Sequence, residues 1–382
     1  MGYLLILTSL LLSNPFKLVG TMKSPVNSYN REVERVLSFA PRPKIRTAIG
    51  YVNIASAYNS YRGWFTDGGN LFFLVRNGRG YKLTSVFRGS QTPQIDKFPV
   101  VQIARSGVNP LGETVLADSD MLYFISPSGK KVRKVSLPFI ITDFHCTGNG
   151  QIVVWGNHFI ASVSDTGKVM WKHFLPSNII SSRFYSISDY FLIQLSGNNY
   201  QARSWKDGRF LWSRKVFGPL STSSWYGFLV GGDVYSLKNG NQFQVIDGKK
   251  GAVKKQIMLQ HSPTSILPHP FKKGMYVFFK SRWVGYYDYE KEKYLWMSEL
   301  GAGVSGTYYT LSNGDLVFLH NNKNIISINS AGRIIWSTPV PDGSQKIHFM
   351  RMPGGNLGLL TYNRLYVIYP PGNTKTPFSG VK

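Results

Sequence analysis

The chain has 382 residues, of which 43% are hydrophobic and 14% aromatic, so it can bury a substantial core. Its 44 basic and 19 acidic residues give a net charge of +25, which favours partners that carry negative charge. A single cysteine, Cys146, excludes a framework of intramolecular disulfides. We interpret this cysteine as a buried apolar residue rather than a nucleophile, because a lone Cys in a strand is usually buried.

An apolar run near the N-terminus, from Tyr3 to Leu12, sets residues 1–20 apart from the rest of the chain. Its length suits a signal segment or a membrane anchor and is too short to span a bilayer. We therefore expect an exported (periplasmic or extracellular) or membrane-associated protein. Residues 21–44 are interpreted as a linker with a short helix at 31–39, which Pro41 and Pro43 end.

Short apolar runs separated by tight polar turns fill the remainder of the chain. Examples lie at 114–125, 151–163, 190–202 and 276–287. Each run is rich in Val, Ile, Tyr and Phe, which is the pattern of strands joined by hairpins. The sequence therefore predicts an all-β domain over residues 45–382. The strand-like segment 44–54 is expected to pair with the short last unit of this domain.

A turn that ends in Gly recurs with a period near 40 residues, and a Trp often follows four positions later. The last residues of these turns, here called anchors, are 80, 129, 167, 208, 251, 292, 332 and 372, and all but Glu292 are Gly. The Trp is kept as Trp171, Trp212, Trp296 and Trp336. This period is the length of a four-stranded, WD40-like blade. We predict a β-propeller of four-stranded antiparallel blades, with eight blades favoured and seven as the alternative.

The best copy of the repeat, from Ala161 to Trp171, resembles the quinoprotein-type (PQQ-like) β-propeller repeat. The resemblance spans roughly residues 64–376. In that family the Trp locks neighbouring blades together, which implies a structural, blade-docking role for the four Trp residues named above. The family includes dehydrogenases that use a quinone cofactor and cofactor-free scaffolds such as the outer-membrane assembly lipoprotein of that fold.

The resemblance implies the non-catalytic scaffold branch, without a cofactor. Dehydrogenases of the family carry adjacent cysteines, a Ca²⁺ held by carboxylate and amide oxygens, and an Asp base. This chain has one cysteine and only 19 acidic residues. The assembly lipoprotein carries a Cys directly after its signal segment, and this chain has none there, which does not support that specific identity.

Two basic clusters lie near equivalent turns of different repeat units and are candidates for binding a polyanion. They comprise Lys130, Lys131, Arg133 and Lys134 in one unit and Lys249, Lys250, Lys254 and Lys255 in another. An anionic polymer or an anionic membrane surface is the partner that such clusters suit. The alternative is a solvated basic face that keeps the protein soluble.

The sequence shows no linear motif for catalysis or metal binding. Its seven His include no pair spaced by four residues, and no phosphate-binding loop is present. We therefore expect a non-catalytic scaffold that docks other protein subunits within a larger assembly and takes no small-molecule substrate. Two alternatives stay open. One is a quinoprotein-like or sugar-active propeller enzyme, and the other is a nucleic-acid-binding propeller.

Overall fold

The computed structural model describes most of the chain from residue 40 onwards. The described residues are 40–49, 62–65, 71–77, 80–86, 94–98, 106–109, 111, 113–126, 132–147, 150–184, 189–196, 199–215, 226–238, 240–279, 283–299, 308–311, 313–320, 323–341, 343, 347–351, 356–361 and 365–371. Within these ranges the chain is all-β, and the one helical element is a 3₁₀ turn, η2 (Val230–Gly232). The predicted segment 1–20 and the predicted helix at 31–39 lie outside the described residues.

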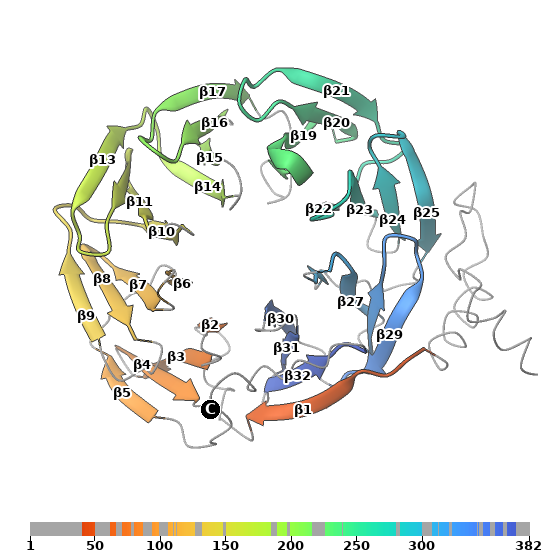
Figure 1. Ribbon diagram of the computed structural model, residues 1–382, viewed down its shortest axis with the longest axis horizontal. Coiled ribbons are helices and arrows are strands. Elements are labelled where there is room, and N and C mark those ends of the chain that lie inside the picture. Colours follow the sequence, from red (N-terminus) through yellow and green to blue (C-terminus); the bar gives the residue numbers. More distant parts are fainter. Residues whose placement is uncertain are drawn as a thin grey trace, which may run out of the picture. The chain divides into compact units, whose positions relative to one another are not determined.

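The strands form eight four-stranded antiparallel sheets in the described part of the chain, one for each predicted repeat unit (Figure 1). The first four sheets are β2 (Arg62–Phe65), β3 (Leu71–Asn77), β4 (Gly80–Val86), β5 (Gln94–Phe98); β6 (Ser106–Val108), β7 (Thr114–Asp118), β8 (Met121–Ile125), β9 (Val132–Ser136); β10 (Asp143–Cys146), β11 (Ile152–Gly156), β12 (Phe159–Val163), β13 (Val169–Phe174); and β14 (Ile179–Phe184), β15 (Tyr190–Leu195), β16 (Asn199–Ser204), β17 (Phe210–Lys215). In each of them, strands adjacent in sequence are neighbours in the sheet.

The next three sheets follow the same rule, and the last one differs. The three are β18 (Tyr226–Phe228), β19 (Val234–Lys238), β20 (Gln242–Ile246), β21 (Val253–Met258); β22 (Ser265–Pro268), β23 (Gly274–Phe279), β24 (Trp283–Asp288), β25 (Lys293–Glu299); and β26 (Tyr308–Thr310), β27 (Leu316–His320), β28 (Asn324–Ile328), β29 (Ile334–Pro339). The last has the order β1-β32-β31-β30, from β1 (Lys44–Ile49), β30 (His348–Arg351), β31 (Leu357–Leu360) and β32 (Leu365–Tyr369).

The N-terminal strand β1 completes the last sheet, because the final repeat unit supplies only three strands of its own. Ile45 of β1 packs against the apolar cluster that contains Leu357 and Leu359 of β31. Just before β1, the backbone N–H of Ser337 on β29 donates to the carbonyl of Pro41 at 3.1 Å. The predicted pairing of segment 44–54 with the last unit is thus confirmed for residues 44–49.

Inner and outer strands of a sheet differ in how they are buried. The second and third strands are apolar on both faces: every residue of β11 and β12 is buried. Such strands pack against neighbouring sheets on both sides, as Val115 and Phe124 of one sheet pack against Ile152 and Val154 of the next. The fourth strand is more exposed in some sheets, and β13 alternates between half-buried and exposed residues.

The described contacts divide the chain into two compact units, and each is considered by itself. One comprises Met1–Ala48, Gly218–Val245 and Lys254–Lys375, and the other Ile49–Phe217, Ile246–Val253 and Thr376–Lys382. Every residue-to-residue contact discussed below lies within one unit. The organisation of residues 45–382 as a single domain stays a prediction.

A β-bulge follows the turn that leads into the fourth strand in four of the sheets. The register shifts at Ser162/Val163, Ala202/Arg203, Tyr286/Tyr287 and Ser327/Ile328. In each case the extra residue stands on the outer strand, one position before the repeat's Trp, as Met170 does before Trp171. A bulge increases local twist and re-aims the side chains beside it. The recurring Gly-to-Trp spacing therefore includes one unpaired residue.

Candidate protein-interaction surface

The recurring Trp contacts the recurring Gly of the next sheet. Trp212 donates its indole N–H to the carbonyl of Gly248 at 2.7 Å, and Trp296 donates to Ser330 at 2.9 Å. Gly251 and Gly332, the anchors of those turns, have positive φ, and a Cβ on either would come within 2.9 Å of the facing indole. The Gly thus serves both its own turn and the Trp that lies on it.

Trp171 makes the same junction without the indole hydrogen bond, and Trp336 also lacks that bond among the described residues. The ring of Trp171 lies on Gly208, where a Cβ would be 2.5 Å from it, and His173 Nε2 lies 2.7 Å from the carbonyl of Asp207. Trp336 is fully buried. For both Trp171 and Trp336, the indole N–H has no hydrogen-bond partner among the described residues.

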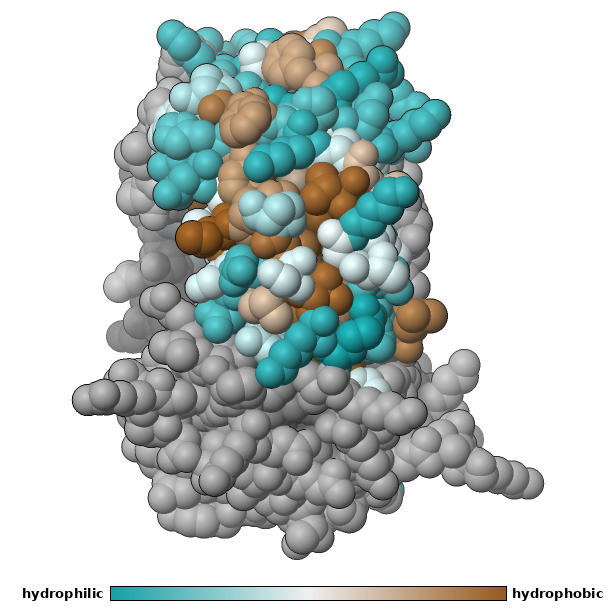
Figure 2. All heavy atoms as spheres, turned by 90° about the vertical axis from the view of Figure 1, so that its left-hand side faces the viewer, coloured by the Kyte–Doolittle hydropathy of each residue, from teal (hydrophilic) through white to brown (hydrophobic). Residues whose placement is uncertain are grey.

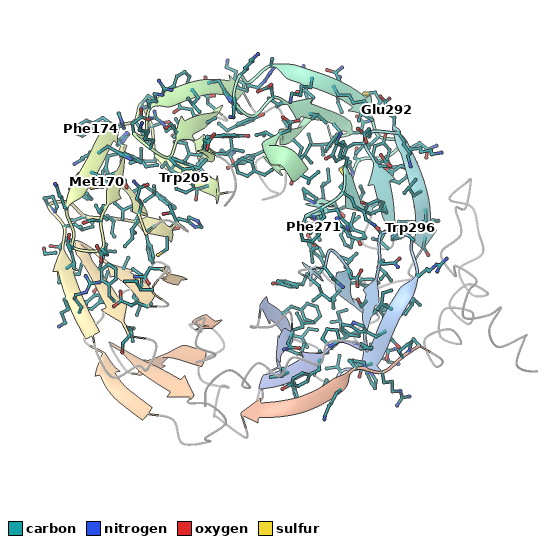
Figure 3. The ribbon with its side chains drawn as sticks, in the orientation of Figure 1. Met170, Phe174, Trp205, Phe271, Glu292 and Trp296 are labelled. Carbon is teal, nitrogen blue, oxygen red and sulfur yellow. The ribbon has the colours of Figure 1, made fainter. Side chains whose placement is uncertain are left out.

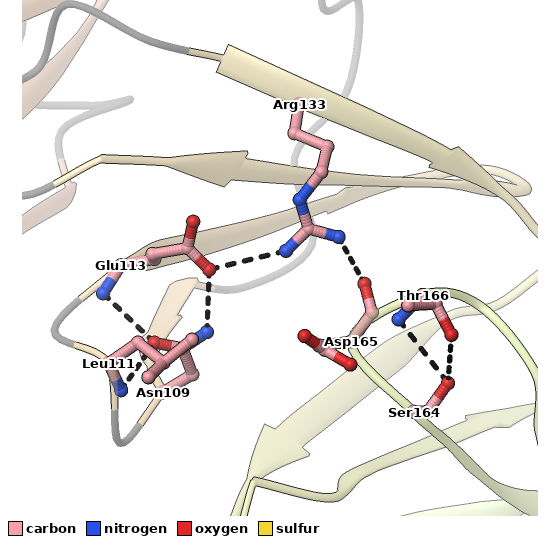
Figure 4. A network of polar contacts seen from close by, with 7 residues as sticks. All are labelled: Asn109, Leu111, Glu113, Arg133, Ser164, Asp165 and Thr166. Carbon is pink, nitrogen blue, oxygen red and sulfur yellow. Dashed lines mark hydrogen bonds and ion pairs between the residues drawn. The ribbon is translucent and has the colours of Figure 1, made fainter.

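Arg133 occupies the Trp position of its sheet and reaches the same part of the next turn (Figure 4). Its guanidinium donates to the carbonyl of Asp165, forms an ion pair with Glu113 at 3.3 Å, and lies 4.0 Å from the ring centroid of Phe124. The Glu113 carboxylate also accepts from Asn109 Nδ2 at 2.9 Å. A cation therefore supplies here the donor that an indole supplies elsewhere.

Lys255 occupies the Trp position of the sheet β18–β21. Its ammonium donates to the carbonyls of Tyr289 at 3.0 Å and Glu290 at 3.1 Å, and forms an ion pair with Glu292 at 2.8 Å. Glu292 stands at the anchor of that turn with φ 55°, where the other described anchors from residue 167 onwards are Gly. Both members of the Gly–Trp pair are replaced together at this junction.

Two of the other residues proposed for polyanion binding are paired with carboxylates. Lys254 forms an ion pair with Asp233 at 2.7 Å, and Lys249 with Asp189 at 3.3 Å. Lys250 is exposed, and Lys134 Nζ lies 5.7 Å from the ring of Tyr123. Lys130 and Lys131 lie outside the described residues. Polyanion binding stays a prediction, although part of the charge invoked for it is engaged within the chain.

An exposed apolar surface lies over the outer strand β13. Phe174 is 80% exposed, Ile140 is 70% exposed and Met170 is 53% exposed. Figure 2 shows apolar side chains gathered on the side of the molecule where β13 lies, and Figure 3 labels Met170 and Phe174 on it. Exposed apolar side chains that cluster in this way are typical of interaction sites.

Lys172 stands at the centre of this surface among three aromatic rings. Its ammonium lies 4.5 Å from the ring centroid of Phe139, 4.7 Å from that of Phe159 and 5.3 Å from that of Phe174. Phe139 and Phe159 meet edge to face at 4.8 Å. We call Lys172 with Phe139, Ile140, Phe159, Met170 and Phe174 the β13 surface. It combines a cation–π arrangement with exposed hydrocarbon.

Close backbone packing holds the β13 surface in place. A Cβ at Gly156 would come 2.4 Å from the ring of Phe159 and 2.5 Å from the carbonyl of Ile140, so only Gly lets these groups approach. The N–H of Thr142 donates to the carbonyl of Trp155 at 2.7 Å, which fixes the connection between β9 and β10 against β11. The rings around Lys172 are therefore carried by tightly fitted segments.

The two groups nearest to catalytic chemistry, the half-buried Cys146 and the buried His269, have pKa values that favour their neutral forms at neutral pH. Burial raises the pKa of the Cys146 thiol to about 12, so the thiolate nucleophile is scarce at neutral pH. Burial, and then the charge of Lys272, lower the pKa of His269 to about 4. The described residues include no cluster of His, Cys, Asp and Glu able to hold a metal ion. They also include no helix that is long and apolar enough to cross a membrane.

Sequence reasoning missed the β13 surface. Its outer-strand residues, Met170, Lys172 and Phe174, read as ordinary members of an apolar strand. Their position relative to Trp171 could have revealed them. Successive residues of a strand point to opposite faces of the sheet, and the Trp171 side chain packs against the next sheet. The residues directly before and after it therefore face the other way.

Comparisons with known proteins place the chain in a family. The family model described as Outer membrane protein assembly factor BamB matches residues 156–352. Three solved structures share the fold. BamB from Moraxella catarrhalis is 12% identical with a TM-score of 0.54, covering 86% of this chain and 99% of its own. Dihydro-heme d1 dehydrogenase NirN is 12% identical with a TM-score of 0.56, and the match covers 73% of this chain and 66% of NirN. The C-terminal WD40 domain of Sif2 is 11% identical with a TM-score of 0.58, and the match covers 87% of this chain and 100% of that domain.

These neighbours confirm the all-β propeller fold, and the family model confirms the resemblance to the PQQ-like repeat. A comparison of the sequence with curated proteins found no match. The family model covers more than half of the chain and includes all four repeat Trp residues, Trp171, Trp212, Trp296 and Trp336. The chain therefore belongs to the family of the outer membrane protein assembly factor BamB.

Proposed function

We propose that the protein is a non-catalytic docking subunit of a larger protein assembly, and that the β13 surface is where a partner subunit binds. Membership of an assembly-factor family supports the docking role. The single observation that carries it on this chain is the exposure of Phe174 and Met170 on the outer strand β13, with the exposed Ile140 from the connection between β9 and β10. Edge strands of soluble proteins usually avoid such exposure, because it invites association.

Two further observations support a role without catalysis. The pKa of the Cys146 thiol is raised by burial, which disfavours nucleophilic chemistry. Many described carboxylates are paired with basic side chains, such as Glu113 with Arg133 and Asp233 with Lys254. We further propose that the protein acts in an exported or membrane-associated assembly, which its family supports.

Affinity purification of the full chain from its native cells tests this proposal. The wild type should be recovered with other protein subunits in a fixed ratio. Phe174→Asp should lose those subunits while its melting temperature stays unchanged, because the side chain is exposed. Met258→Asp is the matched control, since Met258 is 63% exposed on another outer strand, β21. A strictly monomeric protein, or equal recovery with Phe174→Asp, would overturn the proposal.

A further inference from the structure

We propose that the open edge of β13 binds an extended segment of a partner protein, which places a carboxylate against Lys172 and an apolar side chain against Phe174. This inference rests on the proposed docking function and specifies the chemistry of the partner. It follows from the backbone directions at β13, from a precedent elsewhere in the same chain, and from the surroundings of the Lys172 ammonium.

The backbone of β13 offers hydrogen-bonding groups to its open side. β13 is the last strand in the order β10-β11-β12-β13. The N–H of Leu175 donates to the carbonyl of His158 at 2.7 Å, and the neighbouring pair in the register is Phe159 with Phe174. In antiparallel ladders, hydrogen-bonded and non-hydrogen-bonded pairs alternate. The N–H and C=O groups of Phe174 and Lys172 therefore point away from β12, towards the open edge.

The same edge position already makes a backbone hydrogen bond to another segment of the chain in a second sheet. Ser337 on β29 stands five residues after its anchor Gly332, as Lys172 stands five residues after Gly167. The N–H of Ser337 donates outward to the carbonyl of Pro41 at 3.1 Å. The outward N–H at this position of an outer strand thus already binds the backbone of another segment of the chain through one hydrogen bond.

The surroundings of Lys172 select the side chain that faces it. Its ammonium lies within 5.3 Å of three ring centroids. Among the described residues, no carboxylate forms an ion pair with it, whereas Lys254, Lys255 and Lys249 each have one. Lys172 is itself exposed, so its ammonium is accessible to an incoming carboxylate, which attracts it more than a neutral side chain would. The excess of basic residues in the chain favours the same choice.

The edge of β21 provides an internal comparison. The N–H of Leu259 donates to the carbonyl of Asn241 at 2.9 Å, so the groups of Met258 and Gln256 face outward by the same alternation. Gln256 stands where β13 has Lys172, and its side chain accepts from Gln244 at 3.0 Å. This edge has Gln256 in place of the cation, and its nearby Lys254 is already paired with Asp233, so it should not select an acidic segment.

A synthetic peptide tests the inference on the full-length protein. The probe is a fluorescent peptide with the central sequence Leu-Thr-Glu-Thr-Leu, and its binding is followed by anisotropy. The sequence reads the same in both directions, so either strand orientation brings a Leu near Phe174 when Glu faces Lys172. We expect Lys172→Gln, or Glu→Gln in the peptide, to weaken binding by about tenfold, and the two changes together to weaken it no further.

Two more variants separate strand addition from nonspecific adhesion. The protein Lys172→Glu should bind a peptide in which Lys replaces the central Glu, because the ion pair is restored with its partners exchanged. A peptide N-methylated at the amides flanking Glu should not bind, because it cannot pair with the edge. Gln256→Glu on β21 should bind the original peptide as the wild type does.

The inference is overturned if the peptide does not bind at millimolar concentration, if Lys172→Gln leaves its affinity unchanged, or if the N-methylated peptide binds equally well. These outcomes are distinct from failure of the docking function. Loss of native partner subunits in Phe174→Asp would then still identify the β13 surface as a contact of another kind.

Discussion

Lys255 and Glu292 form a 2.8 Å ion pair at the place where neighbouring junctions bring together a Trp and a Gly. The indole lies so close to the turn that the turn residue cannot carry a Cβ, as Trp212 with Gly251 and Trp296 with Gly332 show. A turn without Gly therefore excludes the Trp that would lie on it. In this junction a lysine, Lys255, takes the place of the Trp and forms an ion pair with Glu292, the residue that takes the place of the Gly.

The effects of Lys255→Trp and Glu292→Gly on the free energy of unfolding should therefore be coupled, with the double variant more stable than the sum of the single effects. Lys255→Trp alone should destabilise the protein by about 1–3 kcal/mol, because its ring meets the Glu292 side chain. Glu292→Gly alone should change stability by less than about 1 kcal/mol, since the exposed ion pair is weak and the φ of 55° suits Gly. Denaturant unfolding of both single variants and the double variant gives the coupling energy. Additive effects would show that Trp and Gly do not contact there.

Adding a methyl group at an anchor Gly should be costly because of the facing Trp. Gly332→Ala places a Cβ 2.8 Å from Trp296 at φ 75°, whereas Gly343→Ala, at φ 64°, meets nothing within 4 Å. The control should lose about 1 kcal/mol from backbone strain, and Gly332→Ala should lose at least about 1 kcal/mol more. The measurement is the free energy of unfolding. Equal losses would mean that the Gly serves only its own turn.

The indole hydrogen bond can be separated from the packing of its ring. Trp296→Phe keeps an aromatic side chain but leaves the carbonyl of Ser330 without its 2.9 Å donor. It should cost about 1–3 kcal/mol, and Trp171→Phe less, because the Trp171 indole N–H has no partner among the described residues. Thermal and denaturant unfolding of the two variants makes the comparison. A larger loss for Trp171→Phe would contradict the role assigned to the hydrogen bond.

Acid should weaken the fold through His269. Its pKa falls to about 4 from an ordinary value of 6.5, chiefly because of burial, so the folded state binds fewer protons than the unfolded state between these values. The corresponding stability is complete above pH 6.5 and is lost as the pH falls towards 4, up to about 3 kcal/mol.

His269→Asn is the matching variant, because an amide oxygen can replace Nδ1 as acceptor for the N–H of Phe271, which lies at 3.1 Å. Unfolding free energies at pH 7 and pH 5 should differ less in this variant than in the wild type. An identical pH dependence in both proteins would assign the effect to other groups.

The strand architecture could be predicted well from the sequence, because the residues that form each hairpin are close together in the chain. Segment 276–287 became β23 and β24, and segment 44–54 supplied β1 of the last sheet. The roles of single charged residues were harder to foresee. Lys255 was proposed to bind a polyanion, yet its partners Tyr289 and Glu292 stand over thirty residues away in the next sheet's turn.

The β13 surface escaped prediction for a related reason. Phe174 and the buried Phe159 are the same residue type in similar apolar strands, and they pair directly in the register. Their difference in exposure depends on whether a strand is third or fourth in its sheet. That position follows from the whole repeat and not from the local sequence.

Photo-crosslinking in native cells tests the central claim most directly. A photoreactive phenylalanine analogue replaces Phe174 in one strain and Met258 in another, both exposed on outer strands. The docking account predicts a discrete adduct with one partner protein at position 174, reduced when Lys172→Glu is also present, and no such adduct at 258. No adduct at position 174, or the same adducts at both positions, would contradict it.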